Sequence, residues 1–329
     1  MYFEVKNLCF SYYKRPLCIK DVSFSLEKNS RMLVLAKDDE GKSTLLKVLS
    51  GFEDTYFGMI KLNGKDIKTI PDNERNFSLL LSEPVLLNSK SIRENIDFLC
   101  DAIGKDHLSD EELLSLFSKF KLERELKAKP KKMTLFEKRK LAILRSHIKN
   151  PLILFLDDQF TGLSGSEQVE MQEIYNMLFE DKSRVIIMTA NNDSYQSNHE
   201  FFKTILLHKI CYLNLSKGYF FDSIQKFENA YIDRDIFKFL SNFSVLSGEI
   251  AKNNDEYFFV DEKNKHRKLA NSYISVLEKL GLENGFSERV EVYFSNDILI
   301  DEISDKIFND YIRENKILIY QNLDGSKVI

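Results

Sequence analysis

Short runs of consecutive apolar residues mark the first elements that the chain predicts. Residues 32–36 and residues 152–156 are apolar throughout and of strand length, which predicts two strands buried on both faces. Residues 20–27 alternate between polar and apolar positions, which predicts a strand with one buried face. Residues 45–49 have helix-like spacing, so a strand, a polar loop and a helix follow one another between residues 32 and 49.

The polar loop carries the end of a phosphate-binding motif, G-x-x-x-x-G-K-[ST]. Four residues match it: Gly41, Lys42, Ser43 and Thr44. In this motif backbone N–H groups surround the phosphates, the Lys neutralises the β and γ charges, and the hydroxyl residue ligates Mg²⁺. Ala36 replaces the first glycine. Three acids that would repel an anionic ligand precede the match: Asp38, Asp39 and Glu40.

A second element of the same kind of site follows about 110 residues later. The apolar run 152–156 ends in two acids, Asp157 and Asp158, which is the form of a Walker B strand. We expect Asp157 to hold Mg²⁺ opposite Ser43. A core strand followed by an ordinary polar loop is the alternative interpretation, and the phosphate-binding motif earlier in the chain argues against it.

Composition limits the kinds of protein that this chain can be. Hydrophobic residues make up 43%, charged residues 30%, and the net charge is −4, so bulk electrostatics give no reason to expect a nucleic-acid partner. The four cysteines form no C-x-x-C pair, which favours a reducing compartment and free thiols. No apolar run of membrane-spanning length and no secretory leader are found, so we expect no direct membrane insertion.

The order of these parts resembles the nucleotide-binding subunits of ABC transporters. Residues 10–12, Phe-Ser-Tyr, lie where that family has the aromatic residue that stacks on adenine, which is Tyr12 here. Residues 60–67 resemble the family's hairpin, with Asn63 and Gly64 as the turn signal. The resemblance implies an α/β fold: an ABC-type P-loop domain with a mixed sheet core, a β subdomain and a helical subdomain.

The linker at residues 70–77 resembles that of ATPase subunits from carbohydrate importers of the maltose type. Such subunits carry a C-terminal β-rich regulatory domain, and its landmarks resemble residues 239–243, 291–298 and 317–325 here. The resemblance implies a nucleotide-binding domain over residues 1–234 and a smaller, shortened regulatory-like domain over residues 235–329. The helical subdomain is expected at about 85–135, where residues 109–117 predict a capped amphipathic helix.

The resemblance also assigns roles to individual positions. The nucleotide-binding residues are expected to be Tyr12, Asp39, Glu40, Gly41, Lys42, Ser43 and Thr44, and the Mg²⁺ ligands Ser43 and Asp157. Ser82 stands at the Q-loop Gln, Asp158 at the Glu that polarises water, Ala190 at the switch-loop His, and Ser164 at the D-loop Asp. Asp158 is one methylene shorter than Glu, and the other substitutions remove the family's chemical group, so hydrolysis is expected to be weak or absent.

The family's signature motif, L-S-G-G-Q, corresponds to Met133, Thr134, Leu135, Phe136 and Glu137. Both glycines are absent. In the family this motif meets the γ-phosphate bound by the other subunit of a dimer, so we expect the Phe136 ring to obstruct that approach and Glu137 to place a negative charge near it. Thr134 and Glu137 form the pattern of a helix capping box.

These observations predict an ATP-binding-type subunit of an ABC importer, with carbohydrate as the expected solute and ATP with Mg²⁺ as the expected cofactors. A second, intact ABC ATPase subunit is the expected heterodimer partner, because a homodimer would contain two defective sites. Membrane permease subunits are the other partners, at the inner face of the plasma membrane. Two alternatives remain: a slow but functional ATPase that drives transport, and a non-catalytic regulator that uses the fold as a docking platform.

Overall fold

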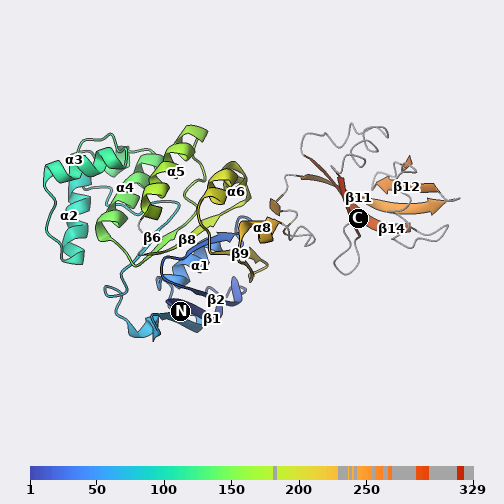
Figure 1. Cartoon of the computed structure of the whole chain (residues 1–329), viewed down its shortest axis with the longest axis horizontal. Coiled ribbons are helices and arrows are strands. Elements are labelled where there is room, and N and C mark those ends of the chain that lie inside the picture. Colours follow the sequence, from blue (N-terminus) through green and yellow to red (C-terminus); the bar gives the residue numbers. More distant parts are fainter. Residues whose placement is uncertain are drawn as a thin grey trace. The chain divides into compact units, whose positions relative to one another are not determined.

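The computed structural model describes residues 1–180, 184–228, 236, 239–240, 243–253, 256–261, 266–268, 287–295 and 317–321. Contacts within the chain divide it into two units, Met1–Ile224 and Gln225–Ile329, and each unit is described by itself (Figure 1). The expected domain boundary at residue 234 falls outside the described residues and stays a prediction. Within the described part of the chain, no helix is both long enough and apolar enough to cross a bilayer.

The first unit contains a ten-stranded mixed sheet in the order β5-β4-β1-β2-β10-β9-β3-β8-β7-β6. Its strands are β1 (Phe3–Phe10), β2 (Ile19–Leu26), β3 (Arg31–Leu35), β4 (Phe57–Leu62), β5 (Lys65–Asp66), β6 (Phe77–Leu80), β7 (Ile153–Leu156), β8 (Val185–Ala190), β9 (Lys209–Asn214) and β10 (Lys217–Phe221). Strands β6, β7, β8, β3 and β9 are parallel neighbours, whereas β2, β1, β4 and β5 pair antiparallel. The expected α/β fold with a mixed sheet is confirmed.

The parallel strands bring the predicted motifs to one edge of the sheet. Leu35 at the end of β3 pairs with Ala190 at the end of β8, and Leu156 at the end of β7 pairs with Met188 of β8. Leu80 of β6 lies opposite Leu156. Because the carboxyl ends of parallel strands meet at one edge, the residues that follow these four strands come together there, as in other open α/β sheets.

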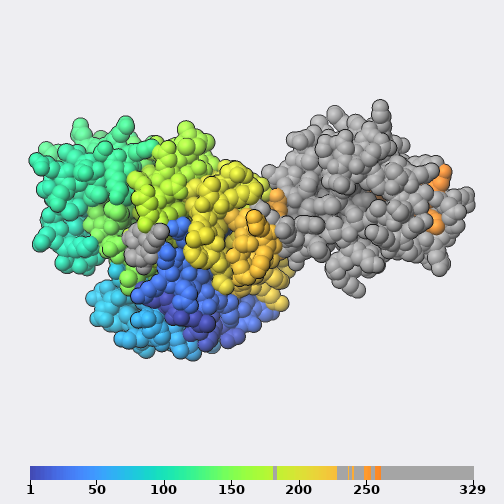
Figure 2. Space-filling model, viewed as in Figure 1, coloured from blue at the N-terminus to red at the C-terminus, as the bar shows by residue number. Residues whose placement is uncertain are grey.

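Eight α-helices are described in this unit or at its end: α1 (Lys42–Leu49), α2 (Ile92–Ile103), α3 (Asp110–Lys119), α4 (Leu135–Lys149), α5 (Gly165–Glu180), α6 (Asn192–Ser197), α7 (His199–Thr204) and α8 (Ile224–Glu228). Two 3₁₀ turns are η1 (Ile67–Thr69) and η2 (Pro130–Lys132). The residues of α2 and α3 gather as one lobe, coloured blue-green, at one end of the first unit (Figure 2). Both helices lie within the stretch expected to form a helical subdomain.

Local sequence signals explain where several of these elements begin and turn. Capping boxes start α2, α3 and α4, and the one at α4 joins Thr134 and Glu137 as predicted. The hairpin β4–β5 turns at Asn63 and Gly64, both with positive φ, which is the backbone that an Asn-Gly pair favours. The predicted strands at residues 20–27, 32–36 and 152–156 and the helix at 109–117 are also confirmed.

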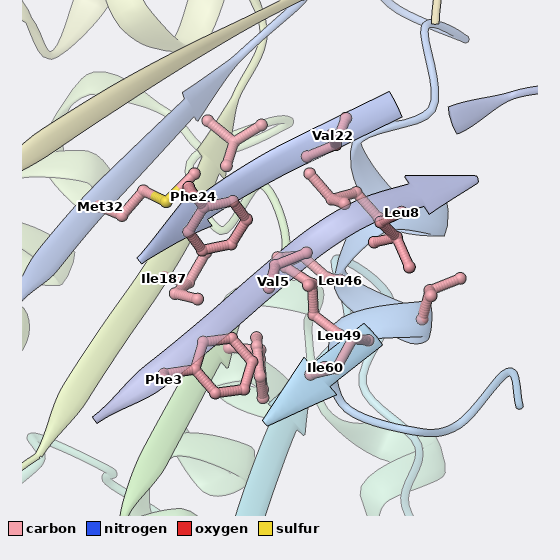
Figure 3. Close-up of a cluster of buried hydrophobic side chains, with 14 of the residues drawn as sticks. Phe3, Val5, Leu8, Val22, Phe24, Met32, Leu46, Leu49, Ile60 and Ile187 are labelled. Carbon is pink, nitrogen blue, oxygen red and sulfur yellow. The ribbon is translucent and has the colours of Figure 1, made fainter. Parts of the chain in front are cut away.

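The core of the first unit lies where α1 packs on the sheet. Leu46 and Leu49 of α1 lie beside Val5 of β1 and Ile60 of β4 in a cluster of fully buried side chains (Figure 3). Burying an aliphatic side chain of this kind stabilises a fold by about 1.5–3 kcal/mol. The helix is therefore anchored by its apolar face, and the loop before it is held at the edge of the sheet.

The second unit contains a five-stranded antiparallel sheet in the order β13-β12-β11-β14-β15. The strands are β11 (Phe243–Asn253), β12 (Glu256–Asp261), β13 (His266–Lys268), β14 (Ser287–Ser295) and β15 (Ile317–Gln321). A β-rich C-terminal region is thus present. Parts of its expected landmarks, at residues 241–242, 296–298 and 322–325, lie outside the described residues.

Candidate functional site

The loop between β3 and α1 curls back around the side chain of Lys42. The Lys42 ammonium is 6% exposed and donates to the carbonyl oxygens of Ala36 at 2.9 Å and Lys37 at 2.7 Å. Gly41, with φ +91°, precedes the helix, and a Cβ atom there would lie 2.8 Å from the carbonyl oxygen of Cys18. Only glycine fits this position, so the retained Gly-Lys pair is required by the geometry of the loop.

The three acids of the loop have different surroundings. The Asp38 carboxylate lies 3.6 Å from the Lys42 ammonium and accepts a hydrogen bond of 3.0 Å from the Asn191 amide. The Glu40 carboxylate accepts from the Leu215 N–H at 2.9 Å, on the strand connection β9–β10. Asp39 is exposed and has a positive φ of 62°. Two of the three charges expected to repel a ligand are therefore already held by groups of the chain.

The two residues predicted to bind Mg²⁺ are in contact. The Ser43 hydroxyl, at the start of α1, donates to the Asp157 carboxylate at 3.0 Å, and the Thr189 hydroxyl of β8 donates to the same oxygen at 3.0 Å. Asp157 is 2% exposed. One carboxylate and one hydroxyl beside a phosphate-binding loop fit Mg²⁺, which takes few protein ligands and completes its shell with phosphate oxygens and water. Ser43 and Asp157 are the residues that would hold it.

Asp158 is fixed by neighbours that the sequence analysis did not identify. Its carboxylate accepts from the Ser194 hydroxyl at 2.8 Å, and its N–H donates to the Thr189 hydroxyl at 2.9 Å. Burial raises the pKa of the Asp158 carboxyl, while hydrogen bonds from Thr161 and Ser194 oppose that rise. The side chain is thus turned toward Ser194, at the first turn of α6, and is held there.

Ser82 and Ala190, at the positions expected to correspond to the Q-loop Gln and the switch-loop His, have short side chains. Ala190 is fully buried at the end of β8, and its carbonyl accepts from the Ala36 N–H at 3.4 Å. The carbonyl of Ser82 accepts from Arg139 at 3.0 Å. The methyl group of Ala190 has no polar atom, and a Ser at position 82 is several bonds shorter than Gln.

A cavity of about 700 Å³ gathers the predicted nucleotide-binding residues. Tyr12 lies at one side, with its hydroxyl 3.3 Å from that of Thr44 and its ring edge-on to Phe10. This volume is in the usual range for pockets that bind a small molecule or cofactor. The residues predicted from the sequence that line it are Tyr12, Asp39, Glu40, Gly41, Lys42, Ser43, Thr44, Ser82 and Asp158.

Two buried polar side chains that the sequence did not predict, those of Arg139 and Gln159, hold the backbone near this cavity by hydrogen bonds. Arg139 of α4 is 2% exposed and donates to the carbonyls of Ser82 (3.0 Å), Gln159 (2.9 Å) and Thr161 (2.7 Å). The Gln159 amide donates to the carbonyls at positions 80, 81 and 157, at 3.1, 3.0 and 2.8 Å. Nothing in the sequence marks Arg139, which only long-range folding brings to these carbonyls.

The sequence does contain a signal for two other residues near the cavity that were not predicted, Asn191 and Ser194. Asn191 and Ser194 follow directly after the buried strand β8, and the spacing Asn-x-x-Ser is that of a helix N-cap. Polar residues that follow a buried strand at the same edge of the sheet as the phosphate-binding loop could have been predicted as site residues from that position alone.

The signature position differs from what we expected. Phe136 is 7% exposed and lies beneath Lys140, whose ammonium is 4.5 Å from the ring centre, so the ring is packed within the chain. Glu137 is paired with Arg124 at 2.7 Å and caps α4, and this pairing holds the pKa of Glu137 below its usual value. Its charge is therefore neutralised within the chain.

The five signature residues do not line the nucleotide cavity: Met133, Thr134, Leu135, Phe136 and Glu137. Ser164, at the D-loop position, hydrogen-bonds to Glu167 at the start of α5. Both segments therefore have a clear structural role as helix starts.

Comparisons with known proteins agree with this geometry. The family described as "ABC transporter" matches residues 19–161. The ABC-type transporter ATP-binding protein EcsA of Bacillus subtilis is 30% identical over 162 residues, covering 49% of this chain and 65% of EcsA. The spermidine/putrescine import ATP-binding protein PotA of Thermotoga maritima is 23% identical over 263 residues, covering 78% of this chain and 68% of PotA.

The chain spans less than two thirds of several curated relatives, for example 13% of the human ATP-binding cassette sub-family A member 10, at 28% identity. Among solved structures, an ATP-binding subunit of an ABC transporter aligns with a TM-score of 0.58 at 21% identity, covering 70% of this chain and 93% of that chain. Likeness at this identity shows the fold. Residues 19–161 are thus similar to the ABC transporter family, and the chain shares the fold of an ATP-binding subunit of an ABC transporter.

Proposed function

We propose that the chain is an ATP-binding subunit of an ABC importer that binds ATP with Mg²⁺ and hydrolyses it slowly. The observation that carries this proposal is the single cavity in which Lys42, Ser43 and Thr44 line one wall, with Asp157 bonded to Ser43 behind it. Lys42 supplies positive charge to the phosphates, and the Ser43–Asp157 pair supplies oxygen ligands to Mg²⁺. When bound, Mg²⁺ would neutralise charge on the phosphate oxygens.

Slow hydrolysis is supported by the side chains at the two positions where the family has its Glu and its His, Asp158 and Ala190. A base must lie within hydrogen-bond reach of the attacking water. The carboxylate of Asp158 is instead bonded to Ser194, and Ala190 offers no polar atom. Loss of one transition-state donor costs a factor of roughly 10²–10³ in rate. From a typical turnover of about 10 per second, the chain alone is expected to turn over at or below about 0.1 per second.

Restoring the family's side chains tests this proposal. Asp158→Glu combined with Ala190→His supplies a longer carboxylate at the cavity and an imidazole at the end of β8. A cavity that binds MgATP and is only slowed gains at least about tenfold in phosphate release, whereas a cavity unable to bind MgATP gains nothing. Lys42→Met in the same background is the control, because it removes the phosphate charge partner. Turnover near 10 per second from the unmodified chain would overturn the proposal.

A permease is the membrane partner that we propose, and an apolar groove supports its place of docking. The groove, of about 350 Å³, lies between β6 and α4 and includes Phe52 and Val85, which are 71% and 78% exposed. Exposed apolar side chains gathered at a groove mark sites of protein contact. We propose that a short helical segment of a permease subunit fills it, which would hold the chain at the inner face of the plasma membrane.

Copurification with a coexpressed permease subunit tests the groove. Val85→Asp places a charge in it and is expected to abolish copurification. Leu206→Asp is the matched control, because Leu206 is 66% exposed and does not line the groove. Equal loss with both variants, or no loss with Val85→Asp, would remove this assignment. Failure of the unmodified chain to bind any permease would favour the transport-independent regulator.

The proposed assembly is a heterodimer with an intact ABC ATPase subunit, because this chain lacks the family's signature glycines. Carbohydrate is the solute that we propose, on the resemblance of the linker at residues 70–77. Relatives named as importers of putrescine and of molybdate or tungstate define the competing outcomes. Uptake of radiolabelled maltose, putrescine and molybdate by cells with and without the gene distinguishes them.

A further inference from the structure

One carboxylate in the nucleotide cavity occupies the place where a phosphate is expected. The Oδ1 atom of Asp38 lies 3.6 Å from the Lys42 ammonium, and the Lys42 side chain is only 7% exposed. In a phosphate-binding loop, this ammonium is the group that pairs with the β and γ phosphates. Asp38 and a nucleotide phosphate therefore compete for the same cation.

A second donor holds the same oxygen of Asp38. The Asn191 amide, on a residue 7% exposed, donates to Oδ1 at 3.0 Å. The Asn191 side chain is held in place, because its side-chain oxygen accepts a hydrogen bond of 2.8 Å from the Ser194 N–H and caps α6. An ammonium on one side and a fixed amide on the other thus converge on one carboxylate oxygen, as they would on a phosphate oxygen.

The Asp38 side chain is also able to move away from Lys42 and Asn191. It is 77% exposed, so it lies at the mouth of the cavity and can turn toward solvent when another anion arrives. Two other residues that line the cavity are also paired within the chain: the Thr44 hydroxyl lies near that of Tyr12, and Glu40 accepts from the Leu215 N–H.

We propose that the Asp38 carboxylate is an internal anion that holds Lys42 and Asn191 and must be displaced before a nucleotide phosphate binds. Nucleotide affinity is then set by this displacement, and Asn191 is the residue that positions Asp38. The proposal rests on the proposed function, since it assumes that the cavity is built for a nucleotide. It explains how an acidic loop coexists with a retained Lys42: the acid serves as the partner of the lysine.

The chain contains a matched control for the effect of charge alone. Asp39 is the next residue, lines the same cavity and is exposed. Within the part of the chain that the structure describes, no hydrogen bond or ion pair joins its side chain to another residue. Asp39→Asn therefore removes the same charge from the same loop without breaking a contact to Lys42 or Asn191, and Asn tolerates the positive φ there.

The test is calorimetric titration of MgATP into four full-length proteins: unmodified, Asp38→Asn, Asp39→Asn and Asn191→Ser. We expect Asp38→Asn to bind MgATP at least about tenfold more tightly than the unmodified chain, because a charge about 4 Å from the phosphate site is removed. Asp39→Asn is expected to gain about threefold or less. Asn191→Ser keeps the helix cap and loses only the amide donor, so it is expected to gain an intermediate amount.

Four other outcomes overturn the inference, and a fifth supports it. Equal gains for Asp38→Asn and Asp39→Asn would mean that loop charge alone governs affinity. A loss of affinity in Asp38→Asn would mean that Asp38 assists binding. If the unmodified chain binds and Asp38→Asn gains nothing, the inference fails and the proposed function stands. If neither binds MgATP, both fail. Binding by Asp38→Asn alone supports the inference most strongly.

Discussion

Removing the Arg139 guanidinium is expected to destabilise the first unit more than any surface change. Arg139→Met keeps the aliphatic bulk but leaves three carbonyls, those of Ser82, Gln159 and Thr161, without their donor. Hydrogen bonds to a charged group contribute about 1.5–3 kcal/mol each. They are not additive, and water can reach the part-buried carbonyls, so we expect a loss of about 3–5 kcal/mol in the free energy of unfolding.

The assay is urea unfolding followed by circular dichroism, because the chain has no tryptophan. Hydrogen exchange of peptides from β6 and β7 localises the loss to the first unit. Arg93→Met is the control: its guanidinium is 26% exposed and pairs with Asp97 and Asp110, so its loss should cost no more than about 1 kcal/mol. An Arg139→Met loss no larger than that of Arg93→Met would refute the reasoning.

Two further predictions concern other parts of the first unit. The Tyr56 hydroxyl is buried and has no hydrogen-bond partner among the residues that the structure describes, and burial raises the pKa of Tyr56 to about 12. The folded chain therefore holds this proton more tightly than the unfolded chain. Relative to Tyr56→Phe, the unmodified protein should lose up to about 2 kcal/mol between pH 10 and 12, which urea unfolding at each pH measures; a pH-independent difference would contradict this. Thr134→Ala removes the cap of α4 and should lower stability by about 1 kcal/mol by the same assay, whereas Thr134→Ser should not, and equal losses would exclude the cap as the cause.

The elements of the phosphate site could be predicted because local patterns specify them. Apolar runs located β3 and β7, the Gly41-Lys42 pair located the loop, and the acids after β7 located Asp157. Parallel strands then bring such residues to one edge of the sheet whatever their distance in sequence. The resemblance supplied the order of the parts, and the cavity contains the predicted nucleotide-binding residues.

What the sequence could not supply is the direction in which each side chain points. The sequence did not predict that the Phe136 ring is buried beneath Lys140. Asp38 was expected to repel a ligand. It pairs with Lys42, four residues away, and with Asn191, and the pairing with Asn191 depends on a contact across 153 positions of the chain. Such contacts follow from the packing of whole elements, which no short motif records.

The central claim is that the cavity at Lys42 and Ser43 binds MgATP and hydrolyses it slowly. Phosphate release by the purified chain, at MgATP concentrations that saturate binding in the same sample, tests it most directly. We expect saturable MgATP binding with turnover at or below about 0.1 per second. Turnover near 10 per second, or no saturable binding of MgATP, would contradict it.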